Sequence, residues 1–402
     1  MNRVTDREIW IESEVPLAGT SEWAIPLRLV EAVAGGKAAK LGSVSPRLAG
    51  NLETIRDIYA AWIDGGSRVP LAFESRANPA VPGHDVSLFF SGGVDSFFSL
   101  ITHRDEINNL VLIHGFDIPL AETRSYALAE AQAREAARLF GKRLIVARTN
   151  LHWEESRLYT DKPRIPCDWG MYHGAALAAV AHALSPNHRK VFIASSYPYA
   201  ALRPWGSHPL LDPLWSTETL QVVHDGGVHR QDKLRVVAQH PEALARLRVC
   251  WENLGNYNCG QCRKCIQTML GLRALGIDHC AAFPDTLSPE IVRRQELSAG
   301  SANAWRRLLS AGLPPDLQAA VRSAIHSYEM GLPPRTGTTR REIKRWLTAA
   351  RIAGRALVAA AGPRKGRGDP SPRVPSCSSV TLARMPRVLR TGRSIAAAED
   401  TN

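Results

Sequence analysis

The chain has 402 residues, of which 45% are hydrophobic and 22% are charged. This composition is typical of a folded protein with two or three domains, and it excludes disorder over the whole length. No run of eighteen apolar residues occurs, and the first residues lack an apolar signal core. We therefore expect a cytoplasmic protein without a transmembrane helix.

The net charge of +12 lies almost entirely in one segment. Residues 335–402 hold fifteen of the fifty Lys and Arg residues but only four of the thirty-eight Asp and Glu residues. The first 334 residues are therefore nearly neutral, which excludes a basic body built to grip a nucleic-acid duplex. Outside this basic tail the chain carries no strong nucleic-acid signal.

Residues 1–84 predict an α/β extension in which we identify no catalytic motif. The alternation of Glu8–Glu12 predicts a strand, and Ser45-Pro46 begins a helix that reaches Ile63. Val69–Phe73 predicts a second strand. We expect this extension to have a structural role.

Residues 85–249 alternate between apolar strands and helices. Strands are expected at Val86–Phe90, Leu110–His114, Leu144–Ala147, Val191–Ala194 and, as a candidate fifth, Thr219–Val223. Helices are expected from a Gly-Gly turn to His103, at Glu122–Phe140 and at Trp169–Leu184. This alternation predicts an α/β fold with a parallel sheet covered on both faces, and ligands bind where its strands end.

One hexapeptide between the first strand and the first helix has the character of an anion site: Ser91, Gly92, Gly93, Val94, Asp95 and Ser96. Two glycines allow a tight turn and a close approach to a ligand, and N–H groups at a helix start attract phosphate oxygens. Ser91 and Ser96 add hydroxyl donors. An aspartate beside phosphate indicates Mg²⁺ between them or a role in orienting the loop. A plain structural turn would not need the whole hexapeptide, and no Walker A sequence occurs.

The hexapeptide resembles the PP-loop motif of the N-type ATP pyrophosphatases, or adenine nucleotide α-hydrolases, and the resemblance covers residues 85–250. It implies a Rossmann-like fold that binds the ATP pyrophosphate on this loop, with Asp95 and Ser96 as catalytic residues. ATP would be cleaved between its α- and β-phosphates to adenylate a carbonyl or carboxyl oxygen, and a nitrogen or sulfur nucleophile would displace AMP. Gly115 and Phe116, after the second strand, would lie against the adenine; a core position is the alternative for Phe116.

Four of the seven cysteines fall within sixteen residues: Cys250, Cys259, Cys262 and Cys265. Their C-x8-C-x2-C-x2-C spacing places four thiolates around one centre and favours a structural Zn²⁺. An iron–sulfur cluster and a redox dithiol are the alternatives. We expect a zinc-binding module at residues 250–285, without a catalytic role for the metal.

The loop followed by this cysteine spacing resembles the 7-cyano-7-deazaguanine synthase family of queuosine biosynthesis, which uses ATP and ammonia to convert a carboxylate into a nitrile. The resemblance covers residues 85–280. Two segments depart from it: the Pro-Gly-Arg-Asn element is replaced by Arg164–Gly170, and Tyr-Pro-Asp-Cys is replaced by Tyr197-Pro198-Tyr199. The resemblance therefore does not establish a deazaguanine as the substrate. The alternatives are an ATP-dependent sulfurtransferase, an amide ligase on another small molecule or peptide, and a non-catalytic nucleotide-binding protein.

Residues 286–334 predict helices, of which one begins at Ser288-Pro289 and another spans Pro315–Met330. In the basic tail, residues 335–402, Arg341–Ala361 could form an amphipathic helix, and disorder is expected after Gly362. Such a helix would pack on the body, attach to an anionic membrane surface or an acidic partner, or make weak nucleic-acid contacts. A small-molecule substrate and a homodimer are the other partners we expect.

Weaker candidates lie near the expected ligand edge of the sheet. Cys167 and Asp168 are candidates for a substrate contact. The alternatives are that Cys167 is a sulfur-transfer nucleophile or that the position is inert. The segment His208–Asp212 could line the pocket, and Arg230 and Lys233 could line it or meet phosphate. We expect the Arg230 side chain to be solvated.

Overall fold

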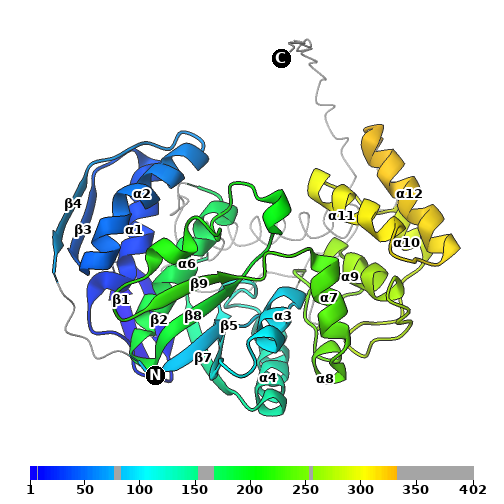
Figure 1. Cartoon of the computed structure of the whole chain (residues 1–402), viewed down its shortest axis with the longest axis horizontal. Coiled ribbons are helices and arrows are strands. Elements are labelled where there is room, and N and C mark those ends of the chain that lie inside the picture. The colour runs from blue at the N-terminus through cyan, green and yellow to red at the C-terminus, as the bar shows by residue number, and fades with distance from the viewer. Residues whose placement is uncertain (7, 77–82, 153–166, 253–256, 333–402) are drawn as a thin grey trace, which may run out of the picture. The chain divides into compact units, whose positions relative to one another are not determined.

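The computed structural model describes residues 1–6, 8–76, 83–152, 167–252 and 257–332. A seven-stranded sheet runs through these residues (Figure 1). In spatial order its strands are β1 (Asn2–Asp6), β2 (Ile9–Ser13), β7 (Arg143–Thr149), β6 (Asn109–His114), β5 (Asp85–Phe89), β8 (His188–Ala194) and β9 (Gln221–Asp225). The strands from β7 to β9 are parallel, whereas β1 and β2 form an antiparallel pair that joins β7. The prediction of an α/β fold with a mostly parallel sheet is confirmed.

The order of the parallel strands creates a switch point beside β5. From β5 the chain adds β6 and β7 on one side, and it then crosses to the other side to add β8 and β9. Leu88 of β5 consequently lies between Leu110 of β6 and Phe192 of β8. In open α/β sheets, ligands bind at such a point, outside the C-terminal ends of the strands. The hexapeptide Ser91–Ser96 begins at this place.

Helices cover both faces of the sheet (Figure 1). On one face lie α3 (Val94–Thr102) and α4 (Thr123–Phe140); on the other lies α6 (Trp169–Ala183), with α1 (Ile25–Gly35) and α2 (Pro46–Trp62) packed into the same core. Residues Val86 and Leu88 contribute to the first core, and Phe89 contributes to the second. Because both faces are buried, the parallel strands are apolar on both sides, which is why their positions are predictable from the sequence.

The N-terminal residues share the core of the α6 face. A two-stranded parallel sheet, β3 (Ala39–Val44) and β4 (Leu71–Ser75), packs there with α1 and α2. Helix α2 begins at the expected Pro46, whereas β1, β3 and α1 were not predicted. Short 3₁₀ helices occur at η1 (Ser21–Ala24), η2 (Ser185–Asn187), η3 (Tyr199–Ala201) and η4 (Asp212–Trp215).

The chain after β9 is helical, as expected for its last described part. The helices are α7 (Arg230–Ala238), α8 (Pro241–Leu244), α9 (Arg263–Arg273), α10 (Pro289–Arg293), α11 (Ala299–Leu309) and α12 (Pro315–Glu329). Ser288 caps α10 by accepting from the Ile291 N–H at 3.3 Å, which confirms the start signal seen in the sequence. Trp305 of α11 is fully buried in the core that these helices share with α3 and α4.

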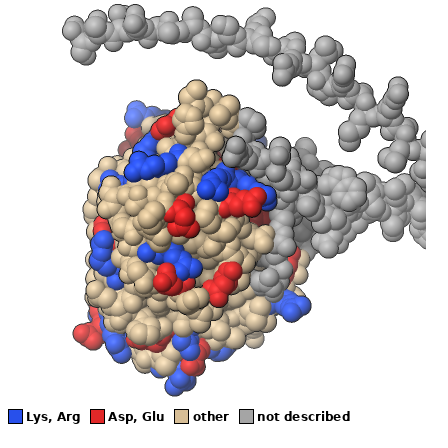
Figure 2. Space-filling view, turned by 90° about the vertical axis from the view of Figure 1, so that its right-hand side faces the viewer, with Lys and Arg blue, Asp and Glu red and all other residues tan. Residues whose placement is uncertain are grey.

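The surface over α7 to α12 carries interspersed charges of both signs among the described residues (Figure 2). Ion pairs there include Arg306 with Glu329 at 2.6 Å. None of the described helices has both the length and the apolar character needed to cross a membrane. The expected amphipathic helix Arg341–Ala361 lies outside the described residues.

We predict that Gly174→Ala destabilises the fold. A methyl group at Gly174, on the buried face of α6, would collide with the carbonyl oxygen of Gly206. Overpacking of this kind costs about 2 kcal/mol in the free energy of unfolding, which chemical denaturation measures. Gly50→Ala is the control, because a methyl group on Gly50 in α2 meets nothing within 4 Å. The control should stabilise the protein by about 0.5 kcal/mol, and equal effects of the two substitutions would contradict the packing of α6.

Candidate functional site

The loop that joins β5 to α3 is a tight turn held from two sides. Gly92 has a φ of 74°, in the left-handed region that favours glycine. The backbone N–H of Arg248 donates to the carbonyl oxygen of Gly92 at 2.7 Å. The Ser96 Oγ donates to the carbonyl oxygen of Gly93 at 3.1 Å. The predicted strand–turn–helix context of the hexapeptide is confirmed.

The start of α3 leaves backbone donors for a ligand. Its N-cap residue is Gly93, which has no side chain that could accept a capping bond from the first turn. The first N–H groups of an α-helix have no partner within the helix and carry the positive end of its dipole. Ser91 is exposed beside them, and its Oγ accepts from the Gly93 N–H at 3.3 Å. The loop can therefore offer N–H donors to an anion.

Asp95, the second residue of α3, forms two ion pairs with α7. Its Oδ2 lies 2.7 Å from Nη1 of Arg230, and its Oδ1 lies 2.8 Å from Nζ of Lys233. The same Nζ donates to the carbonyl oxygen of Ser195, just after β8, at 2.6 Å. Only 2% of the Lys233 side chain is exposed. A buried ammonium group is costly without a partner, so Lys233 depends on this carboxylate.

Two opposing effects set the pKa of Asp95. Burial raises the pKa of this carboxyl, but the charges of Arg230 and Lys233 outweigh burial and hold it below its ordinary value. The expectation that Arg230 is solvated is wrong, because the start of α7 faces the start of α3 and the guanidinium pairs with Asp95. No local pattern in the sequence indicates this pairing.

A third cation, Lys264 of α9, lies within electrostatic range of Asp95. Lys264 interacts electrostatically with Asp95, Asp117 and Arg230. Desolvation and the Arg230 charge lower the pKa of Lys264, and the two carboxylates oppose this shift. Its Nζ also lies 5.1 Å from the ring centre of Trp251, in a cation–π contact. Helices α7 and α9 thus bring three cations to the start of α3, and the contribution of Lys264 was missed in the sequence.

In the segment after β6, Gly115 and Phe116 contact other parts of the protein. Gly115 has a φ of 108°, and a side chain there would collide with the carbonyl oxygen of Thr149. The close approach that requires glycine is therefore to Thr149, the last residue of β7. Phe116 is partly buried, and its ring packs edge-on against Trp169 with the centroids 5.1 Å apart.

The four cysteines form one largely buried cluster, as predicted. Their Sγ atoms lie within 4.8 Å of one another. The pairs Cys259–Cys265 and Cys250–Cys262 have sulfur separations of 4.0 Å. Tetrahedral zinc with Zn–S bonds of about 2.3 Å places its sulfurs about 3.8 Å apart. The cluster can therefore hold a metal ion such as zinc.

Backbone donors support negative charge on these sulfurs. The Cys262 N–H donates to the Sγ of Cys259 at 3.2 Å, and the Cys265 N–H donates to the Sγ of Cys262 at 3.5 Å. Such donors favour the thiolate, which is the form that metals bind. Gly260, with a φ of 67°, makes the tight turn between Cys259 and Cys262.

Buried Asn258 fastens the cluster to the rest of the protein. Its side-chain oxygen accepts from the N–H groups of Val249 and Cys250 at 3.0 and 3.2 Å. Its side-chain nitrogen donates to the carbonyl oxygens of Leu247 and Ala282, both at 2.7 Å. All of the hydrogen-bonding capacity of this amide is used, so it fixes three chain segments relative to the sulfurs.

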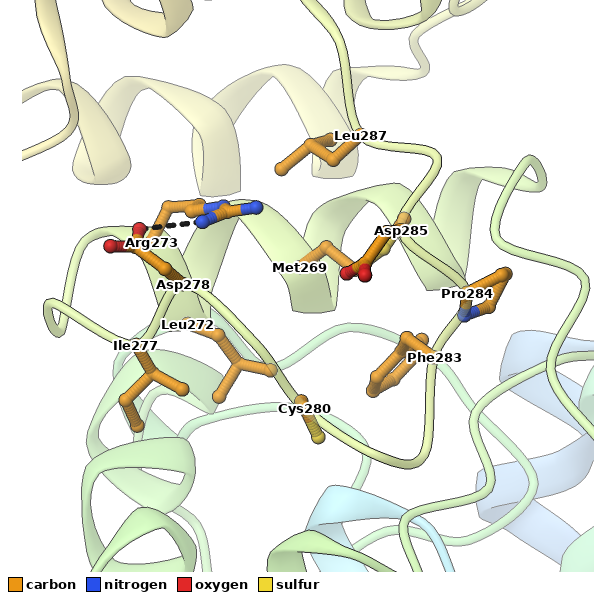
Figure 3. A pocket seen from close by; sticks show the side chains of 10 residues that line it. All are labelled: Met269, Leu272, Arg273, Ile277, Asp278, Cys280, Phe283, Pro284, Asp285 and Leu287. Atoms are coloured by element: carbon orange, nitrogen blue, oxygen red, sulfur yellow. Dashed lines mark hydrogen bonds and ion pairs between the residues drawn. The ribbon is translucent and has the colours of Figure 1, made fainter.

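A small hollow lies beside α9 (Figure 3). Its volume is about 20 Å³, roughly the room that one water needs. It is lined by Met269, Leu272, Arg273, Ile277, Asp278, Cys280, Phe283, Pro284, Asp285 and Leu287. Because no residue of Ser91–Ser96 lines this hollow, it is not the expected nucleotide site.

The segment His208–Asp212 belongs to a buried network. The Oδ2 of Asp212 accepts from the Ser207 Oγ at 2.7 Å and lies 2.7 Å from the His224 Nδ1. Asp212 is fully buried. These bonds give Asp212 a structural position, and the His208 ring packs edge-on against Trp62 at 4.8 Å.

Cys167 is partly buried near the start of α6. Burial raises the pKa of its thiol to about 12, and the nearby Asp168 and Glu31 add to this shift. Nucleophilic cysteines have lowered pKa values, so Cys167 lacks the electrostatic environment of a sulfur-transfer nucleophile.

Comparisons with known proteins assign no family to the chain. No protein-family model matches it, and no curated protein or solved structure matches it either.

We predict that the purified protein contains about one zinc ion per chain, because a closed four-thiolate site favours this metal. Elemental analysis measures the content. Cys262→Ser should lower the zinc content and the melting temperature together, since metal binding contributes to folding free energy. Cys280→Ser, outside the cluster, is the control and should keep its zinc. A brown protein that contains iron would instead identify an iron–sulfur cluster.

We also predict that Asp95→Asn lowers the free energy of unfolding by about 2 kcal/mol, because it leaves Lys233 buried without a counter-charge. The folded state lowers the pKa of Asp95, so its stabilisation is complete above the ordinary carboxyl pKa. It is lost as pH falls through the lowered folded-state pKa. The difference between wild type and variant should therefore shrink in acid, as denaturation at several pH values would show.

Asp232→Asn is the matched control for this prediction. Asp232 also lies in α7 and pairs with Arg235 at 2.7 Å, but 53% of its side chain is exposed. Exposed pairs contribute little, so this substitution should change stability by less than about 0.5 kcal/mol. A similar loss in both variants would show that Asp95 has no special role.

Proposed function

We propose that the protein is an ATP-dependent enzyme with a Rossmann-like nucleotide-binding domain of the PP-loop type. It adenylates a carboxylate or carbonyl oxygen of a small molecule, releases pyrophosphate, and lets a nitrogen nucleophile displace AMP. The observation that carries this proposal is the convergence of three cations, Arg230, Lys233 and Lys264, on the start of α3 at the switch point of the sheet.

The residues of this group have distinct roles in the proposed reaction. The α3 N–H groups and Arg230 bind the pyrophosphate and stabilise the negative charge that develops on it as the bond to the α-phosphate breaks. Lys233 is buried and supports Asp95 from the protein side. Asp95 is a positioning residue, because its two oxygens hold Arg230 and Lys233 in place. Ser96 keeps the loop closed through its bond to the Gly93 carbonyl oxygen.

The donor set around Asp95 does not suit a protein-bound Mg²⁺. Both carboxylate oxygens face a cation at 2.7–2.8 Å, and Mg²⁺ needs oxygen ligands that are not already shared with positive groups. In the proposed reaction Asp95 therefore holds no Mg²⁺ ion. Mg²⁺ would enter with the phosphates of ATP.

The properties of the cysteines favour a nitrogen nucleophile over a sulfur nucleophile. Cys167, with its raised pKa, is not prepared for sulfur transfer. The four clustered cysteines suit a closed structural zinc site, which leaves no open position for chemistry. A sulfurtransferase is consequently less well supported than a nitrogen-transferring enzyme.

The segment that departs from the 7-cyano-7-deazaguanine synthase family supports a flat, anionic substrate. The ring of Tyr197 packs edge-on against Trp205, with the centroids 5.5 Å apart. The guanidinium carbon of Arg203 lies over both rings, at 4.4 and 5.4 Å from their centres. Aromatic rings with an arginine suit a planar group that carries a carboxylate.

The proposed function predicts that ATP is converted to AMP, and thin-layer analysis of α-labelled ATP measures this. The reaction mixtures contain ammonia and a panel of planar carboxylic acids that includes 7-carboxy-7-deazaguanine. Arg230→Met should lower AMP formation by at least ~10²-fold, the scale of one lost transition-state contact to developing charge.

Arg235→Met is the matched control, because Arg235 lies on the same helix with 54% of its side chain exposed. It should keep wild-type activity. Formation of ADP would contradict the proposed bond cleavage, and nucleotide binding without turnover on every acid would favour a non-catalytic nucleotide-binding protein.

A further inference from the structure

Lys264 lies between the cysteine cluster and the loop Ser91–Ser96. In the sequence it stands between Cys262 and Cys265, within the first turn of α9. In space it interacts electrostatically with Asp95 of the loop and with Arg230 of α7. It is thus a sequence neighbour of two expected metal ligands, and its charge interacts with the loop Ser91–Ser96.

The contact with Trp251 adds a second tie to the cluster. Trp251 directly follows Cys250, and its ring centre lies 5.1 Å from the Lys264 Nζ. Both partners of this cation–π contact are therefore neighbours of cysteines whose sulfurs would share one metal ion. The metal would fix the ring and the lysine relative to each other.

The charges around Lys264 have both signs. Arg230 and Lys233 are positive, Asp95 and Asp117 are negative, and the Cys262 sulfur also interacts electrostatically with Lys264. The dipole of α3 adds positive potential at the same place. Surrounding protein atoms partly desolvate Lys264, but its side chain keeps solvent-exposed surface that an incoming ligand can reach.

We propose that Lys264 binds the phosphates of the nucleotide and thereby couples the metal centre to the nucleotide site. The proposal rests on the proposed function in taking the ligand to be ATP or its pyrophosphate. The metal then does more than hold the fold together, because it presents one of the phosphate-binding side chains. Coupling of this kind is reciprocal: bound nucleotide must strengthen metal retention by the same factor by which the metal strengthens nucleotide binding.

Binding of ATP and of inorganic pyrophosphate to the full-length, zinc-loaded protein tests the contact, with calorimetry as the measurement. Lys264→Ala should weaken both affinities about tenfold, the scale of one charge-assisted contact, while zinc content is unchanged. Lys264→Arg keeps the charge and should retain most of the affinity.

Arg263→Ala is the matched control. Arg263 also lies between the two cysteines and over Trp251, at 5.2 Å, but its Nη1 donates to Ser298 near α11 at 3.4 Å. It should keep wild-type affinity to within about twofold. Equal affinities of the Lys264→Ala and Arg263→Ala proteins would overturn the contact while leaving the proposed function intact. A wild-type protein that binds neither ligand would overturn both, whereas binding without AMP formation would overturn the proposed function alone.

Metal release gives an independent measure of the coupling. A chromogenic chelator should remove zinc more slowly from the wild-type protein when ATP is present, and Lys264→Ala should abolish most of this protection. Arg263→Ala should preserve it. Equal release rates with and without ATP in a wild-type protein that binds ATP would overturn the coupling.

Discussion

The carboxylate of Asp95 is the interaction on which the arrangement of the site depends. It joins the start of α3 to α7 through Arg230 and Lys233, and Lys233 extends the connection to the chain after β8. Three segments that are far apart in sequence are therefore fixed around one pair of oxygens. Because Lys233 is buried, its ammonium group has few alternatives, and this makes the position of α7 well defined.

The cysteine module extends this arrangement on the side of α9. Its four sulfurs define the start of α9, and Asn258 ties the same turn to the chain before and after it with four hydrogen bonds. The Gln231 side chain of α7 donates to the Gly271 carbonyl oxygen of α9 at 2.9 Å, so the two cation-bearing helices are joined directly. A metal at the cluster and an anion at the loop would therefore stabilise neighbouring parts of one framework.

The sequence was sufficient for the features that depend on local pattern. The parallel strands are apolar because both sheet faces are buried, the loop is marked by adjacent glycines, and the cysteine spacing is short. The pairing of Asp95 with Lys233, across 138 positions, left no such mark, since it depends on where the crossovers place α7. The addition of β1 and β2 to the parallel sheet was equally hidden, because Ile11 meets Thr149 only in the folded chain.

That pairing of β2 with β7 has a consequence for the order of events during synthesis. Ile11 leaves the ribosome long before Thr149, so the N-terminal strands have no edge to join while the intervening chain is made. A contact between such distant positions closes a long loop, which slows folding. Until then Trp23, Ile25 and Leu29, which are buried in the finished protein, lack much of their final covering. The nascent chain is thus prone to aggregation during this interval. A chaperone that acts then would have its greatest effect on the yield of folded protein.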